Sequence, residues 1–272
     1  MPAGARSATA GHPWRKKSTG AIAIFRGVGI ERDKREIPRI WEVDWAIPPA
    51  DGGTRWEAYD WLLEMAGELD ADEVNIVAST YDSLGNLDWA IGASEAQRLR
   101  VQPHEYKVGG ITVRGVSRRG FWHVKGAVLV AWPDDQVMAE IEGKKPAAIA
   151  AVAQWPDDVA TWRSVYEPIR IGQVRPDQEA EFDTATIAEL DPQVADAIRG
   201  AAAIVNENHA VLSTHEREVM AGALVALRSA GIPVNEEALR AWLMAAQWQG
   251  RLVNQVLELA DRVDRGETPK HS

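Results

Sequence analysis

The sequence has no cysteine among its 272 residues. Disulfide bridges, thiolate zinc sites, iron–sulfur clusters and cysteine nucleophiles are therefore excluded. A reducing intracellular compartment is compatible with this composition, so we expect a cytoplasmic protein.

Long apolar runs are also missing. Basic residues precede position 20, but the apolar stretch that follows them covers only residues 21–25. A signal peptide needs a longer run, and a transmembrane helix needs about 20 apolar residues. We therefore expect a soluble protein with no membrane partner and a flexible basic tail at residues 1–19.

The common signatures of catalysis and cofactor binding are absent as well. No GxGxxG follows a strand, and there is no P-loop, HExxH or GxSxG sequence. The six histidines are scattered, with no pair at metal-ligand spacing. The sequence therefore predicts no cofactor and no metal site, and it leaves open whether the protein is an enzyme.

Charge is unevenly distributed along the chain. The net charge is −10, yet residues 1–35 contain eight basic residues against two acids, and residues 98–125 contain seven against Glu105 alone. If these two stretches meet in the fold, they form a cationic patch on an acidic protein.

The pattern up to residue 172 alternates strands and helices. We expect strands at 21–25, 40–47 and 73–79, a helix at 54–69 that starts with a capping box of Thr54 and Glu57, and a helix at 86–99. The segment from 111 to 126 is typical of a hairpin whose turn is Ser117 to Gly120.

The tetrapeptide WPDD occurs twice, at 132–135 and 155–158, and we call these the first and second WPDD copies. Each copy follows an apolar strand and precedes a helical pattern. The segment 132–146 between the strands is just long enough for a helical crossover, which predicts parallel neighbours. Both copies are then expected at the same edge of one sheet.

From residue 184 onward the pattern is helical only, with a capping box of Ser213 and Glu216 and an N-cap at Asn235. The sequence therefore predicts an α/β protein with a Rossmann-like, mostly parallel sheet and a hairpin, followed by an α-helical C-terminal subdomain. The expected organisation is a tail at 1–19, an α/β domain at 20–172, a linker at 173–183, a helical domain at 184–266 and a tail at 267–272.

The WPDD aspartates have two interpretations. In one, Asp134 and Asp157 are helix N-caps, and Asp135 and Asp158 lie favourably against the helix dipoles. In the other, these carboxylates bind Mg²⁺ or Mn²⁺ at the carboxyl edge of the sheet, as in a metal-dependent phosphoesterase or nuclease. The candidate catalytic residues are then Asp134, Asp157, Asp82 and Asp88.

Pro133, Asp134, Glu142 and Lys144 form a PD…ExK pattern that resembles the nuclease motif of the restriction-enzyme-like superfamily. The resemblance covers about a dozen residues and implies metal-dependent cleavage of nucleic acid. In that family the second acid and the lysine lie on a strand beside the first acid. Here the segment EIEGKK is typical of the end of a helix.

Basic and aromatic residues alternate in the segment SRRGFWHVK. Arg118, Arg119, His123 and Lys125, next to two aromatic residues, are candidates for binding a phosphate-bearing anion or nucleic acid. The alternative is a solvated turn beside a core strand. Among the twelve tryptophans, Trp132 and Trp155 recur at equivalent places and are expected to be core anchors.

The C-terminal helices have a charge balance near zero, which is not the pattern of a DNA-binding domain. We expect this helical region to pack against the α/β domain or to contact a protein partner or a second copy of the chain. The leading interpretation is a soluble intracellular binding or regulatory protein without catalysis, which recognises an anionic or a protein partner. The alternative is the metal-dependent phosphoesterase or nuclease.

Overall fold

The computed structural model describes residues 37–46, 56–124, 126–182, 187–205 and 211–267. The basic tail at 1–19, the strand expected at 21–25 and Thr54 of the first capping box lie outside these residues. No helix in the described ranges is long and apolar enough to cross a bilayer.

The described residues form an α/β fold around one mostly parallel sheet. Its strands are β1 (Arg39–Val43), β2 (Glu73–Ala78), β3 (Glu105–Val108), β4 (Ile111–Ser117), β5 (Ala127–Ala131), β6 (Ala148–Ala153) and β7 (Ile169–Arg170). The sheet has seven strands in the order β3-β4-β2-β5-β6-β1-β7. Only the β3–β4 pair is antiparallel.

Helices accompany and follow the sheet. Those of the first part are α1 (Glu57–Glu68), α2 (Tyr81–Gly85), α3 (Asp88–Ile91), α4 (Ala93–Arg100), η2 (Arg118–His123), α5 (Asp135–Glu142), η3 (Pro156–Val159), α6 (Ala160–Tyr166) and η4 (Pro176–Phe182). After them come α7 (Pro192–Ala202), α8 (Thr214–Ser229), α9 (Glu236–Ala245) and α10 (Gly250–Asp264).

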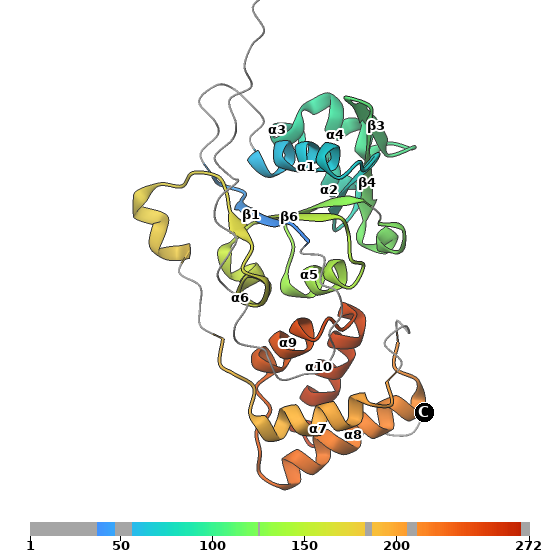
Figure 1. Ribbon diagram of the computed structural model, residues 1–272, viewed down its shortest axis with the longest axis vertical. Helices are drawn as coiled ribbons and strands as arrows, with labels where there is room; N and C mark the ends of the chain where they lie inside the picture. The colour runs from blue at the N-terminus through green and yellow to red at the C-terminus, as the bar shows by residue number, and fades with distance from the viewer. Residues whose placement is uncertain (1–36, 47–55, 125, 183–186, 206–210, 268–272) are drawn as a thin grey trace, which may run out of the picture. The chain divides into compact units, whose positions relative to one another are not determined.

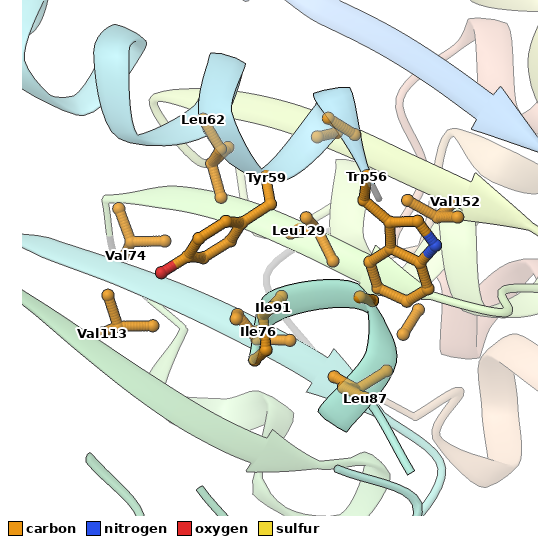
Figure 2. Packing of buried hydrophobic residues seen from close by; sticks show 14 of the residues in the cluster. Trp56, Tyr59, Leu62, Val74, Ile76, Leu87, Ile91, Val113, Leu129 and Val152 are labelled. Carbon is orange, nitrogen blue, oxygen red and sulfur yellow. The ribbon is translucent and has the colours of Figure 1, made fainter. Parts of the chain in front are cut away.

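The two faces of the sheet bury separate cores. On one face, helices α1 to α4 cover residues such as Ile76 and Leu129, and Figure 2 shows Tyr59 and Leu62 of α1, with the N-cap residue Trp56, directed at this core. On the other face, α5 and α6 cover the alternate positions of the strands. The central strands are buried on both sides, as expected of parallel strands between helical layers.

The helices α7 to α10 enclose a third core. These helices also contact the helices that cover the sheet: the Tyr166 hydroxyl of α6 donates to the Met244 carbonyl of α9 over 2.8 Å. Gly250 lies against α5 so closely that a Cβ atom there would be 2.3 Å from the backbone nitrogen of Glu140. A side chain at position 250 would therefore push α10 away from α5.

Several sequence predictions are confirmed. Strands β5 and β6 are parallel neighbours, so both WPDD copies lie at the same edge of the sheet. Ser213 and Glu216 form the predicted capping box of α8, and Asn235 caps α9. The helix expected at 86–99 is interrupted, because Gly92 with φ of 106° separates α3 from α4.

The predicted hairpin turn at Ser117 to Gly120 is wrong. The hairpin is formed by β3 and β4, and its turn is Gly109 and Gly110, with φ of 55° and 93°. Two successive residues of positive φ suit a tight hairpin, and glycine adopts them without steric cost. The predicted turn is instead the start of η2, which leads the chain past β2 to β5.

Candidate functional site

The first WPDD copy connects β5 to α5. Trp132 has a φ of 51°, an uncommon conformation for a bulky residue, and turns the chain sharply after the strand. Its Nε1 donates to Asp44 over 3.0 Å, and its ring meets Trp56 edge-on. Asp134 accepts the amide of Val137 over 2.7 Å, so this predicted N-cap is confirmed.

Asp135 links the first copy to the helix that follows the second. One carboxylate oxygen accepts the amide of Thr161 over 3.0 Å, and the other accepts the amide of Trp162 over 2.8 Å. Burial raises the pKa of Asp135, and the hydrogen bonds from Thr161 and Trp162 oppose this rise. The start of α6 is therefore capped by a residue from a different helix.

The second copy has a different geometry. Trp155 has an extended backbone and is 56% exposed, so the prediction of a core anchor is wrong. Asp158 accepts the Trp155 amide over 2.9 Å, whereas Asp157 is exposed within η3. The prediction that Asp157 is an N-cap is therefore wrong. Pro156 starts the short 3₁₀ turn two residues earlier than an N-cap at Asp157 would allow, and Asp158 completes the cap.

A cleft of about 620 Å³ lies between the ends of these two connections and the C-terminal helices. One wall consists of the start of α5 and of η3, and the other consists of α9 and α10. The lining residues are Asp134, Asp135, Gln136, Asp158, Glu236, Arg240, Asn254, Leu257, Glu258 and Asp261. Since α5 and η3 follow β5 and β6, the cleft lies at the carboxyl edge of the sheet, where open α/β folds bind ligands.

Carboxylates dominate the lining: among the lining residues that the structure describes, six are acids and one, Arg240, is basic. The acids of the two WPDD copies accept backbone amides, as described above. On the opposite wall, Glu236 pairs with Arg240 over 3.0 Å, and Asp261 pairs over 3.0 Å with Arg265, which is largely exposed. Glu258 is exposed. The described lining residues of α10 therefore carry two negative charges, and Arg265 beside them carries one positive charge.

Glu142, at the end of α5, connects α5 to β1 and α6 through buried and partly buried hydrogen bonds. Arg39 of β1 donates to both carboxylate oxygens, over 2.7 and 2.9 Å, and Trp162 Nε1 donates over 2.8 Å. Asp134 and Glu142 are at opposite ends of one helix, about 12 Å apart at the usual helical rise. The arrangement of the nuclease motif, with its second acid on an adjoining strand, is not formed here.

The other acids proposed for catalysis also have local partners. Asp82 pairs with Arg100 over 3.1 Å at the surface, and Asp88 accepts the amide of Trp89 over 2.8 Å. Within the described ranges, no group of three or more histidines and acids is arranged to hold a metal ion. The phosphoesterase alternative and its use of Mg²⁺ or Mn²⁺ stay predictions.

The predicted anion-binding residues are placed only in part. Arg118 and Arg119 begin η2, and Arg118 is 3.9 Å from Glu140, a distance at the limit of an ion pair. Arg119 is exposed. The backbone of His123 ends η2, and Lys125 lies outside the described residues. An anion site on this segment therefore stays a prediction that rests on the two arginines.

Sequence reasoning missed the wall of the cleft that α10 forms. Its lining positions 254, 257, 258 and 261 recur at helical spacing and combine polar and acidic side chains with one leucine. That spacing indicates one face of a helix. Nothing in the sequence indicates that this face lies opposite the WPDD copies.

A family model described as a domain of unknown function (DUF1889) matches residues 190–272. The matched segment contains α7 to α10, and with them the α9 and α10 wall of the cleft. Comparison of the chain with curated proteins and with solved structures gives no match. The similarity therefore concerns the helical part and assigns no activity to it.

Proposed function

We propose that the protein is an intracellular binding or regulatory protein without catalysis, and that it holds a basic segment of a protein partner in the acidic cleft. The observation that carries this proposal is the cleft itself, with its six carboxylates and one arginine. A lysine- or arginine-rich segment complements such a lining, and charge complementarity raises both the association rate and the specificity.

An exposed aromatic residue beside the cleft supports the same partner. Trp155 is 56% exposed, and its amide binds Asp158 of the cleft lining. The face of an indole attracts lysine and arginine side chains, and exposed tryptophans are frequent energetic centres of protein interfaces. A basic segment in the cleft would therefore find an aromatic contact next to the carboxylates.

The path of the chain through the sheet supports a binding role for this edge. The helices after β2 cover one face and lead to β4, whereas α5 after the neighbouring β5 covers the other face and leads to β6. This divergence lies between β2 and β5, next to the β5–α5 connection that lines the cleft, and such a divergence is the usual position of a ligand in Rossmann-like folds. Under this proposal, a Rossmann-like domain at 20–172 and a helical domain at 184–266 supply the two walls, in a soluble cytoplasmic protein.

Titration with a fluorescent lysine-rich peptide tests the proposal. We expect binding that weakens as salt is added, because the contacts are between exposed charges. The double variant Glu258→Gln, Asp261→Asn should bind about tenfold more weakly, which corresponds to about 1.4 kcal/mol. Glu64→Gln with Glu68→Gln is the matched control, since it removes two exposed charges from α1 on the other face of the sheet.

The same titration, repeated with an oligonucleotide and with Mn²⁺, tests the remaining interpretations. Equal affinity of the two double variants would contradict the cleft as the binding site. Binding of an oligonucleotide that is lost in Arg118→Ala with Arg119→Ala would favour the anionic partner instead. Stabilisation by Mn²⁺ that is lost in Asp134→Asn would favour the phosphoesterase.

A further inference from the structure

Glu42 is a charged residue in an interior position of the sheet. It lies on β1 between Trp41 and Val43, and only 1% of it is exposed. Its neighbour on the same face is Ile40, which belongs to the core under α1. The function proposed above makes no use of this carboxyl group.

One of the two carboxyl oxygens of Glu42 has a hydrogen-bond partner among the described residues, and the other does not. Oε2 accepts the amide of Ala58 over 2.8 Å, whereas Oε1 has no hydrogen-bond partner in the described part of the chain. Ala58 belongs to the first turn of α1, whose N-cap residue Trp56 provides no side-chain cap. Glu42 therefore caps α1 from the neighbouring strand, and one buried oxygen remains without compensation.

The chain beyond β7 closes over this oxygen. At Gly172 a Cβ atom would lie 3.2 Å from Oε1 and 3.1 Å from Cγ of Glu42. Gly172 also has a φ of 75°, which favours glycine. The contact leaves Glu42 enclosed between β1, the start of α1 and the segment that follows β7.

The charges around Glu42 oppose its ionisation. Glu57 at the start of α1 and Asp44 just after β1 are both acidic. Strand β6 offers only apolar residues, and Arg170 of β7 pairs with Glu179. Burial raises the pKa of Glu42 to about 8; the backbone amides of Ala58 and Glu57 oppose the rise, and the side-chain charges of Glu57 and Asp44 add to it.

We propose that Glu42 is a proton switch between β1 and α1: it is neutral while it holds its proton, and loss of that proton loosens the start of α1. A neutral carboxyl group avoids most of the cost of burial, whereas a carboxylate enclosed beside two acids does not. The first turn of α1 follows directly from Trp56, whose indole donates to Asp44. Ionisation therefore acts on the aromatic cluster at the carboxyl edge.

The sign of the pH dependence follows from the raised pKa. The folded protein holds this proton more tightly than the unfolded chain, whose glutamate has the ordinary value of 4.5. The stabilising contribution is complete below about pH 4.5 and is lost as the pH rises towards about 8. Above that range the folded protein contains the buried carboxylate and is least stable.

Unfolding of the wild type and of Glu42→Gln, measured between about pH 5 and pH 9, tests the proposal. The melting temperature of the wild type should fall relative to the variant as the pH rises, so that the variant is the more stable above pH 8. The difference between the two proteins is the relevant quantity, because Asp135 and Glu140 also have raised pKa values. Glu64→Gln on the exposed face of α1 should keep the wild-type pH profile.

A second measurement does not require a variant. Carbon NMR of the glutamate carboxyl groups in the wild type should show one titration near pH 8. Over the same pH range, the hydrogen-exchange rate of the Ala58 amide should rise more steeply than the intrinsic exchange rate does. Parallel pH profiles for wild type and Glu42→Gln, or ordinary titration of every glutamate, would overturn the proposal. If Glu42→Gln fails to fold, the NMR titration of the wild type alone tests the proposal.

Discussion

The first WPDD copy places its tryptophan against the core, whereas the second leaves its tryptophan on the surface. Trp132 has a left-handed backbone and hydrogen-bonds Asp44, while Trp155 is extended and 56% exposed. The same four residues also begin an α-helix in one case and a 3₁₀ turn in the other. The tetrapeptide determines that a helix starts nearby, and its tertiary partners determine which residue caps it.

Asp135 shows how that difference arises. It accepts the first amides of α6, so the helix after the second copy is capped from outside its own connection. No residue of the second copy needs to perform that task, and Asp157 remains exposed. The two copies are therefore unequal parts of one structure, and substitutions should affect them unequally.

The largest loss in the free energy of unfolding should come from removing Glu142, which connects α5 and α6, the two helices that follow the copies. Glu142→Ala leaves Arg39 without its carboxylate in a largely buried position, and we expect a loss of about 3 to 5 kcal/mol in the free energy of unfolding. Urea denaturation measures it. Asp82→Ala breaks the exposed pair with Arg100 and should cost no more than about 1 kcal/mol. Similar losses in both variants would contradict a structural role for Glu142.

The second largest difference in the free energy of unfolding should be between variants of the two tryptophans. Trp132→Ala removes a ring packed against Trp56 and leaves Asp44 with one indole donor fewer, so we expect a loss of about 3 kcal/mol. Trp155→Ala should change the free energy of unfolding by less than about 0.5 kcal/mol, because the ring is mostly in solvent. Thermal unfolding of both variants gives the comparison, and equal losses would show that Trp155 is also a packing residue.

The smallest difference should be between the third residues of the two copies. Asp134→Ala removes the N-cap of α5 and should cost about 1 kcal/mol. Asp157→Ala should cost less than about 0.5 kcal/mol, since Asp157 is exposed and does not cap η3. Denaturant midpoints of the two variants measure this, and the reverse order would contradict the assignment of the caps.

Local signals predicted most of the elements. The buried strand β2 and the parallel pair β5 and β6 follow from short apolar runs with a crossover between them. The capping box of α8 is visible because its two residues bond each other's backbone. Strand β7 was not predicted, since two residues are too few for a periodic pattern.

The site was predicted less well because it depends on contacts between distant segments. The acids of the two WPDD copies were recognised, but Asp135 accepts the amides of Thr161 and Trp162, which lie 26 and 27 positions away. The burial of Glu42 was likewise missed, because a single glutamate in IWEV also fits a strand with one solvated face. Which face α1 covers is decided only by the assembled fold.

We propose above that a basic protein segment binds between the WPDD copies and the C-terminal helices. Photo-crosslinking of a lysine-rich peptide to the full chain, followed by mass spectrometry, tests it most directly. The structure predicts crosslinks to η3, α9 and α10, around Trp155, Glu258 and Asp261, with loss of the α10 crosslinks in Glu258→Gln, Asp261→Asn. Crosslinks confined to α1 to α4, or unchanged in that variant, would contradict it.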